Sequence, residues 1–184
     1  MSKKDNVTKL LWLDMEMTGL NVKTEVPIEI AGIITDWKWQ PLATYHAVIQ
    51  QAAKFLDAMD DWNQKHHRES GLLALIPNGK PAKVVDQEFA AWIAEHFAEE
   101  RAVLAGNSIN QDRLFINKYL PLTEAKLHYR MLDVTSWKVV FNGLYGKKFK
   151  KREPHRALED IRESIDELKF YLSFLTPSAL NSGG

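Results

Sequence analysis

Residues 10–20 read LLWLDMEMTGL, a short apolar run that passes directly into two acids and a Thr-Gly pair. Such a run, ended by a Thr-Gly break, is typical of a buried strand. Alternate side chains of a strand point to the same face, so Asp14 and Glu16 share one face and Met15 points to the other. Two carboxylates in one space repel each other, and Mg²⁺ and Mn²⁺ prefer oxygen ligands. The stretch therefore predicts a metal-binding strand end, although an isolated Asp-X-Glu is more often two solvated acids.

The segments that follow predict two further strands. Residues 28–35 form a second apolar run that ends before Asp36, and residues 42–49 form a third. The connection at 36–41 is short enough for a hairpin. We therefore expect three sequential strands that pair antiparallel.

The apolar period then changes to that of a helix. The first expected helix has one apolar face, made of Val85, Phe89, Trp92, Ile93 and Phe97. The next expected elements are a strand at 102–105, a helix at 110–120 stopped by Pro121, a strand at 129–132 and a short helix at 134–141. A last helix follows Pro154, with an apolar stripe at Ala157, Ile161, Ile165, Leu168, Leu172 and Leu175. This order predicts an α/β fold with a mixed five-stranded sheet, three antiparallel strands first, flanked by helices.

The composition fits one soluble domain. The chain has 184 residues, of which 45% are hydrophobic and 26% charged, so it can bury a substantial core. We expect residues 1–184 to form a single domain with a tail-like end at 178–184. Without cysteine, neither a disulfide framework nor a thiolate metal site is available. The N-terminal segment lacks an apolar run long enough for a signal peptide or a membrane span, so a cytoplasmic location without membrane contact is expected.

The charge balance limits the kind of partner. Lys plus Arg and Asp plus Glu both number 24, so the formal net charge is zero. A neutral protein is not expected to hold long duplexes by releasing many counterions, but it can make a few phosphate contacts or reach phosphates through metal ions. The basic run at 147–152 is interpreted as a solvated loop.

Two further acids and a histidine could complete the acid pair. Asp112 lies in the first turn of its expected helix, where the helix dipole alone favours an acid, but on the apolar side, where a buried charge needs a partner. Asp160 lies near the start of the last helix, and His155 lies at its junction with the preceding loop. A histidine has the intrinsic pKa to accept a proton from water at neutral pH.

Five motifs occur along the chain in a recognisable order and spacing. They are DMEMTGL at 14–20, MDDWN at 59–63, GNSINQDR at 106–113, HYRMLDV at 128–134 and HRALEDIRES at 155–164. From about Leu10 to Phe174, the chain resembles the oligoribonuclease family of DEDDh exonucleases. The resemblance implies an RNase H-like fold, a homodimer, two Mg²⁺ or Mn²⁺ ions and 3′-to-5′ release of 5′-mononucleotides from RNA of two to about five nucleotides.

The resemblance also implies a role for each chemical group. Asp14 is expected to bridge both ions, Glu16 and Asp160 to complete one metal site, and Asp112 to support the other. His155 is expected to be the general base, and Glu16 to contact the terminal ribose hydroxyl as well. In a two-metal scheme, one ion lowers the pKa of the attacking water and the other stabilises the leaving 3′ oxygen.

The substrate-binding residues implied by the resemblance form a base pocket and a phosphate cap. The pocket consists of Leu20 and Trp62, which sandwich two bases, with Ser108 and Gln111 beside them. The cap over the 5′ phosphate consists of His67 together with Tyr129, Arg130 and Thr135 presented by the other subunit. An arginine suits such a site because it can bind phosphate in a bidentate manner.

Two other functions remain open. A DEDDh exonuclease that trims longer DNA or structured RNA ends would share the acid set, but the zero net charge and the MDDWN and HYR motifs favour short RNA. A catalytically silent RNase H-like binding module would be expected to lack part of the acid set, whereas all five positions are filled here.

Overall fold

The computed structural model describes residues 7–150 and 156–175, which form a five-stranded mixed sheet with helices. The strands are β1 (Lys9–Met17), β2 (Pro27–Asp36), β3 (Pro41–Val48), β4 (Ala102–Gly106) and β5 (Leu127–Asp133), in the spatial order β3-β2-β1-β4-β5. The first three pair antiparallel, whereas β4 is parallel to β1 and β5 is parallel to β4. The predicted sheet is thereby confirmed.

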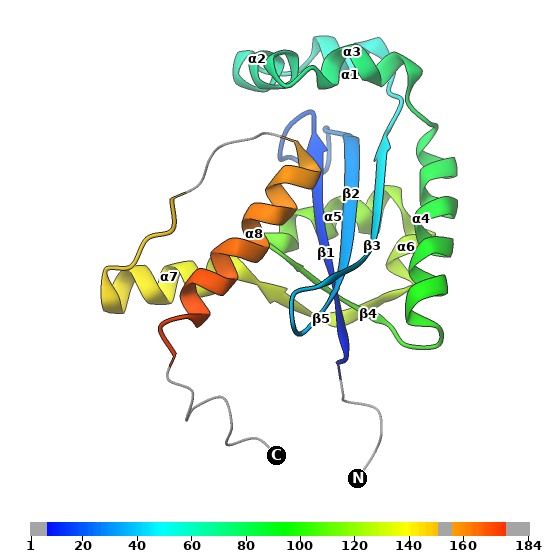
Figure 1. Ribbon diagram of the computed structural model, residues 1–184. Helices are drawn as coiled ribbons and strands as arrows, with labels where there is room; N and C mark the ends of the chain where they lie inside the picture. The colour runs from blue at the N-terminus through cyan, green and yellow to red at the C-terminus, as the bar shows by residue number, and fades with distance from the viewer. Residues whose placement is uncertain (1–6, 151–155, 176–184) are drawn as a thin grey trace.

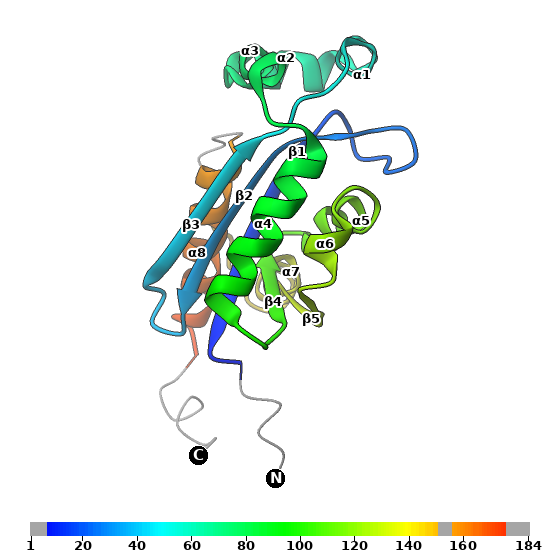
Figure 2. The ribbon, with the colours of Figure 1, turned by 90° about the vertical axis from the view of Figure 1, so that its right-hand side faces the viewer.

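Helices cover both faces of this sheet (Figures 1 and 2). α8 (Ala157–Leu172) lies on one face, and α4 (Ala82–Phe97), α5 (Ile109–Tyr119) and α6 (Pro121–Glu124) lie on the other. α7 (Val134–Tyr145) follows β5 and packs on α8. Figure 1 shows α1 (Ala53–Asp57), α2 (Asp61–Glu69) and α3 (Leu72–Leu75) together at one end of the sheet, followed by the 3-10 turn η1 (Ile76–Asn78). No helix of the described residues is long and apolar enough to cross a membrane.

β1 is held by two separate cores, one on each face of the sheet. Leu11 and Leu13 belong to the core that contains side chains of α4 and α5. Leu10 and Trp12 belong to the core that contains side chains of α8. Fully burying one such side chain contributes about 1.5–3 kcal/mol. The strand that carries the acid pair is therefore fixed from both sides.

The structure differs from the sequence-based expectation in three places. The short helices α1, α2 and α3 were not expected, because α2 is polar and buries only His67 and the other two have few residues. α5 ends at Tyr119 as Pro121 predicted, but Pro121 then opens α6, where its missing N–H removes no helical hydrogen bond. The prediction that Leu175 continues the last helical stripe was wrong, because α8 ends at Leu172.

Candidate active site

The acid pair of β1 lies on the side of the sheet that α8 covers. Leu10 and Trp12 pack toward α8, so the period of two directs Asp14 and Glu16 to the same side. The first turn of α8 carries Asp160, at a helix end where the dipole favours an acid. One carboxylate oxygen from each of these three acids lies within 4.8 Å of the others. The fold thus brings together acids from two distant segments of the chain.

The charges in this three-acid group repel one another in a partly buried space. Burial, followed by the charges of Asp160, Glu29 and Asp112, raises the pKa of Glu16 to about 8, while Arg156 has a lowering effect. A divalent cation among the carboxylates would relieve this repulsion. All the donor atoms are oxygens, so the group fits a hard cation such as Mg²⁺ or Mn²⁺.

Asp112 lies beside the same strand but makes a different contact. Its buried carboxylate accepts a hydrogen bond of 2.9 Å from the backbone N–H of Met15, the residue between the two acids of β1. Burial raises the pKa of Asp112 and the charge of Asp133 adds to this, although hydrogen bonds from backbone N–H groups oppose the shift. Asp112 is therefore joined to β1 through the strand backbone, and the three-acid group found among the described residues does not include it.

The turn before α5 is fixed by hydrogen bonds to the end of β5 and the start of α7. Ser108 has a left-handed backbone with φ 50°, which costs about 1–2 kcal/mol for a residue other than glycine. Its N–H donates to Asp133 Oδ1 at 3.0 Å and to Thr135 Oγ1 at 2.9 Å. These bonds hold the turn that orients α5. Ser108 of the predicted base pocket and Thr135 of the predicted cap thus contact each other within one chain.

The structure describes only one of the two histidines that were predicted for the site. His155 lies outside the described residues, as do the predicted tail at 178–184 and the end of the basic run, so the structure does not test the predicted general base. His67 is buried on α2, where its Nε2 lies 3.0 Å from the carbonyl oxygen of Met17. Its Nδ1 lies 4.0 Å from Glu16 Oε2, so this residue of the predicted cap borders the acid group of its own chain.

Several of the predicted substrate-binding residues have exposed side chains, in contrast to His67. Leu20 and Trp62 are 75% and 59% exposed. Gln111 donates from Nε2 to the carbonyl of Leu20, so α5 supports the loop after β1. On β5, Tyr129 is 72% exposed, and the guanidinium of Arg130 lies 5.3 Å from its ring centroid. Leu20, Trp62 and Tyr129 therefore reach the surface, where the Trp62 ring stacks on that of His66 with the centroids 3.8 Å apart.

The sequence analysis missed Glu29, a buried acid in β2 that lies opposite Glu16 in the antiparallel register. It accepts hydrogen bonds from the Arg156 side chain and lies 2.7 Å from His46 Nε2. A charged residue within the apolar run at 26–34 is the signal that could have found it, because a buried acid requires partners.

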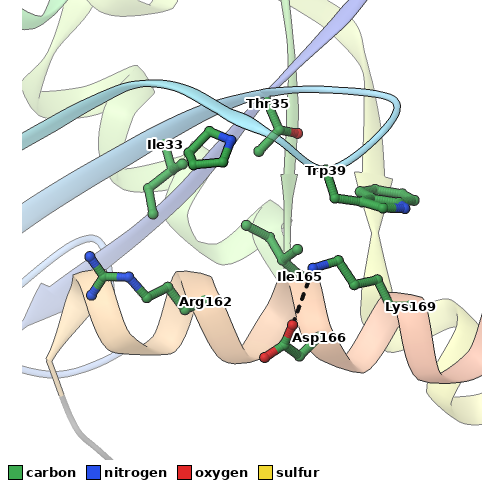
Figure 3. A pocket seen from close by; sticks show the side chains of 8 residues that line it. Ile33, Thr35, Trp39, Arg162, Ile165, Asp166 and Lys169 are labelled. Atoms are coloured by element: carbon green, nitrogen blue, oxygen red, sulfur yellow. Dashed lines mark hydrogen bonds and ion pairs between the residues drawn. The ribbon is translucent and has the colours of Figure 1, made fainter.

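A hollow of about 230 Å³ lies apart from this site, between the β2–β3 hairpin and α8 (Figure 3). Trp39 of the hairpin forms part of its wall. Its charged groups interact along α8, with Lys169 Nζ 3.3 Å from Asp166 and Arg162 3.9 Å from Glu159. None of the predicted site residues lines this hollow, so it is separate from the acid group.

Comparison with known sequences gives consistent matches over nearly the whole chain. The exonuclease family model RNase_T matches residues 11–168. The oligoribonuclease of Shewanella loihica is 42% identical over 170 residues, which cover 89% of this chain and 93% of that protein. The oligoribonuclease of Francisella tularensis subsp. novicida is 42% identical over 175 residues, which cover 93% of this chain and 96% of that protein.

Comparison with solved structures gives the same fold in more distant proteins. E. coli exonuclease I in complex with a 5cy-dT13 oligonucleotide has a TM-score of 0.66 at 15% identity, covering 92% of this chain and 41% of that chain. Exonuclease I from Methylocaldum szegediense has a TM-score of 0.68 at 17% identity, covering 95% of this chain and 42% of that chain. The chain spans about two fifths of exonuclease I, with which it shares the RNase H-like fold.

Proposed function

Because the chain belongs to the exonuclease family and, within it, to the oligoribonucleases, we propose that it degrades very short single-stranded RNA from the 3′ end to 5′-mononucleotides. The observation that carries the proposal is the meeting of Asp14, Glu16 and Asp160, whose carboxylate oxygens lie within 4.8 Å of one another. Three acids gathered in a partly buried space have a physical reason to bind a cation. Hydrolysis of a phosphodiester is the chemistry that such a group serves in this family.

In this proposal the acids bind the metal ions and the histidine acts as the general base. Asp14, Glu16 and Asp160 would hold the divalent ions, with Asp112 completing the set from α5. Divalent ions held by these carboxylates would supply activation of water and neutralisation of charge on the phosphate and the leaving oxygen. His155 accepts the proton of the attacking water, which is the role that the intrinsic pKa of a histidine suits.

The proposed preference for short RNA rests on two exposed apolar side chains. Leu20 and Trp62 would sandwich the two terminal bases, and both side chains are exposed. Gln111 supports Leu20 through its backbone carbonyl, and Ser108 lies at the start of the same helix. Stacking a base on an aromatic ring contributes about 1–3 kcal/mol, so the pocket would account for much of the affinity for a dinucleotide.

We further propose that residues 1–184 act as one domain and that two copies form a homodimer. α7 exposes Val139 and Leu144 to 66% and 73%, and exposed apolar side chains on one helix are typical of an interaction surface. Tyr129 and Arg130, exposed on β5, would reach the 5′ phosphate held at the other subunit's site. His67 is buried in its own chain beside Glu16, so the cap would combine this histidine with Tyr129, Arg130 and Thr135 of the other subunit.

A labelled RNA pentamer provides the test of activity and direction. With Mg²⁺, 5′-labelled substrate should shorten one nucleotide at a time from the 3′ end, with release of 5′-mononucleotides. A chelator should stop the reaction and added Mg²⁺ should restore it, since the acid group has only oxygen donors. A 3′-blocked pentamer is the control and should resist. Internal cleavage products, or hydrolysis that persists in chelator, would contradict the proposal.

A further inference from the structure

Glu29 is a fully buried acid of β2 that joins three elements beside the acid group. Its Oε1 accepts a hydrogen bond from Arg156 Nη2 at 2.7 Å, and Nε of the same guanidinium lies 3.1 Å from Oε1. Its Oε2 accepts the backbone N–H of Ala157 at 3.2 Å. His46 of β3 approaches Oε1 to 2.7 Å through Nε2. One carboxylate thus links β2, β3 and the start of α8.

The Glu29 carboxylate is charged at neutral pH. Burial alone would raise its pKa, but hydrogen bonds from His46, Arg156 and the Ala157 backbone outweigh burial and lower the pKa of Glu29 to about 2. A buried ion pair is weak evidence for added stability, because taking two charges out of water offsets most of their attraction. The pair therefore remains ionised at neutral pH in a position directly opposite Glu16 in the strand register.

Arg156 connects Glu29 to the third acid of the site. It is the N-cap residue of α8, with extended backbone angles of φ −139° and ψ 130°. Its carbonyl oxygen accepts the backbone N–H of Asp160 at 3.0 Å, which closes the first turn of the helix. Its Nη1 lies 3.4 Å from the carbonyl of Ser70, the C-cap residue of α2. Arg156, the hydrogen-bond partner of Glu29, is therefore itself hydrogen-bonded to Asp160 through the backbone.

We propose that Glu29 and Arg156 are positioning residues for catalysis, an ion pair that sets the first turn of α8 so that Asp160 faces the acids of β1. Glu29 also stands opposite Glu16 in the strand register, so the same pair joins the two segments that meet in the three-acid group. His155 directly precedes Arg156 in the sequence, so the pair also fixes where the described helix begins after it. The proposal rests on the exonuclease function proposed above, and neither residue touches the reacting atoms.

The test compares Glu29→Gln, Arg156→Gln, the double variant and Arg156→Lys with the wild-type protein. We expect kcat on an RNA dinucleotide at saturating Mg²⁺ to fall about tenfold to a hundredfold in each Gln variant, because a small displacement of a catalytic group has effects of this size. KM should change less than about threefold, since the base pocket is untouched. The double variant should lose about as much as either single variant, because the two residues act as a unit. Arg156→Lys keeps the charge and should recover part of kcat.

Hydrogen exchange of the metal-free protein gives a readout that does not depend on catalysis. Backbone amides at 157–160 should exchange faster in Glu29→Gln and Arg156→Gln, while those of the second half of α8 should be unchanged. Glu88→Gln, which breaks an exposed ion pair with Lys80, is the matched control and should alter neither quantity. All rates are to be measured where thermal unfolding shows each variant folded, and Arg156→Gln suffices if Glu29→Gln does not fold.

Two results would overturn the positioning role. One is a kcat within about twofold of wild type in a folded Gln variant, and the other is exchange that speeds up across the whole chain in proportion to lost stability. If the wild-type protein has no activity on RNA, the proposed function fails instead. In that case faster exchange confined to 157–160 would still show that the pair holds the helix start.

Discussion

β1 and α8 place the carboxylates of the acid group close together in a partly buried space, and this proximity and burial raise the pKa of Glu16. Glu16 is next in the period of two after Asp14, and Asp160 reaches both from the first turn of a helix more than a hundred residues later in the sequence. Asp112 contacts the same strand by accepting the N–H of Met15. At this scale, removal of one charge should affect catalysis far more than folding.

Replacement of single acids tests this directly. Asp14→Asn and Asp112→Asn should remain folded but lose at least about a hundredfold in kcat, since metal ions supply several kcal/mol of transition-state stabilisation. Asp166→Asn, at an exposed position on the same helix as Asp160, is the control and should retain activity. Thermal unfolding and turnover at saturating Mg²⁺ are the measurements. Near wild-type turnover by either variant would refute the metal-binding assignment.

The raised pKa of Glu16 predicts a pH dependence of stability. Its ordinary value is 4.5 and its folded value is about 8, so between these the folded protein holds a proton that the unfolded chain releases. The metal-free protein should therefore lose stability as pH rises through this window. Glu16→Gln lacks the ionisable group, so its Tm should exceed that of the wild type by a few degrees at pH 8 and match it at pH 5. An equal Tm difference at both pH values would show that Glu16 is not the cause.

Addition of Mg²⁺ should reverse this trend, because binding requires ionised carboxylates. Saturating Mg²⁺ should raise the Tm of the wild-type protein more at pH 8 than at pH 6. Glu16→Gln should show a smaller rise at both pH values. Differential scanning calorimetry of both proteins at both pH values, with and without Mg²⁺, measures these changes in Tm. A larger rise in Tm at pH 6 than at pH 8 would contradict the acid group as the binding site.

Among the elements, β1 was predictable from its continuous apolar run and α8 from its apolar stripe. The period of two predicted that Asp14 and Glu16 share a face, whereas only the structure shows that Leu10 and Trp12 of that face pack against α8. The short helices at 53–75 could not be predicted, since they bury few side chains and so have no clear period. The Glu29–Arg156 ion pair joins residues far apart in sequence, and a local pattern cannot show such a contact.

The exposed face of α2 should contribute to substrate affinity. Trp62→Ala should raise KM for an RNA dinucleotide about tenfold, because base stacking is worth about 1–3 kcal/mol. Trp37→Ala is the matched control, since Trp37 is an exposed tryptophan on the β2–β3 hairpin. Steady-state kinetics with both variants decides the matter, and an unchanged KM for Trp62→Ala would remove this residue from the base pocket.

For the whole molecule, the proposed homodimer makes the site composite. Arg130→Ala should weaken binding of a 5′-phosphorylated dinucleotide, while metal affinity measured by calorimetry stays unchanged. Mixing Arg130→Ala with Asp112→Asn subunits should restore one working site in each mixed dimer, since each change damages a different half. No recovery in a verified heterodimer would mean that Arg130 acts within its own subunit.

The zero net charge of the chain agrees with a substrate that offers few phosphates. A pocket closed by Leu20 and Trp62 on the bases and by Arg130 at the 5′ phosphate would leave no room for a longer chain to continue. A terminal phosphate also carries more charge than an internal diester, so charge-assisted hydrogen bonds favour the shortest substrate. We therefore expect the protein to hydrolyse short RNA faster than long RNA, as its membership of the oligoribonucleases suggests.

The most direct test is a single-turnover length series with 5′-phosphorylated RNA from two to ten nucleotides in saturating Mg²⁺. The rate should be highest for the dinucleotide and should fall progressively as the RNA lengthens. In Arg130→Ala the advantage of the dinucleotide over a heptamer should narrow, because the terminal phosphate loses its partner. Equal wild-type rates at all lengths would contradict the dinucleotide pocket and leave a general 3′-to-5′ exonuclease.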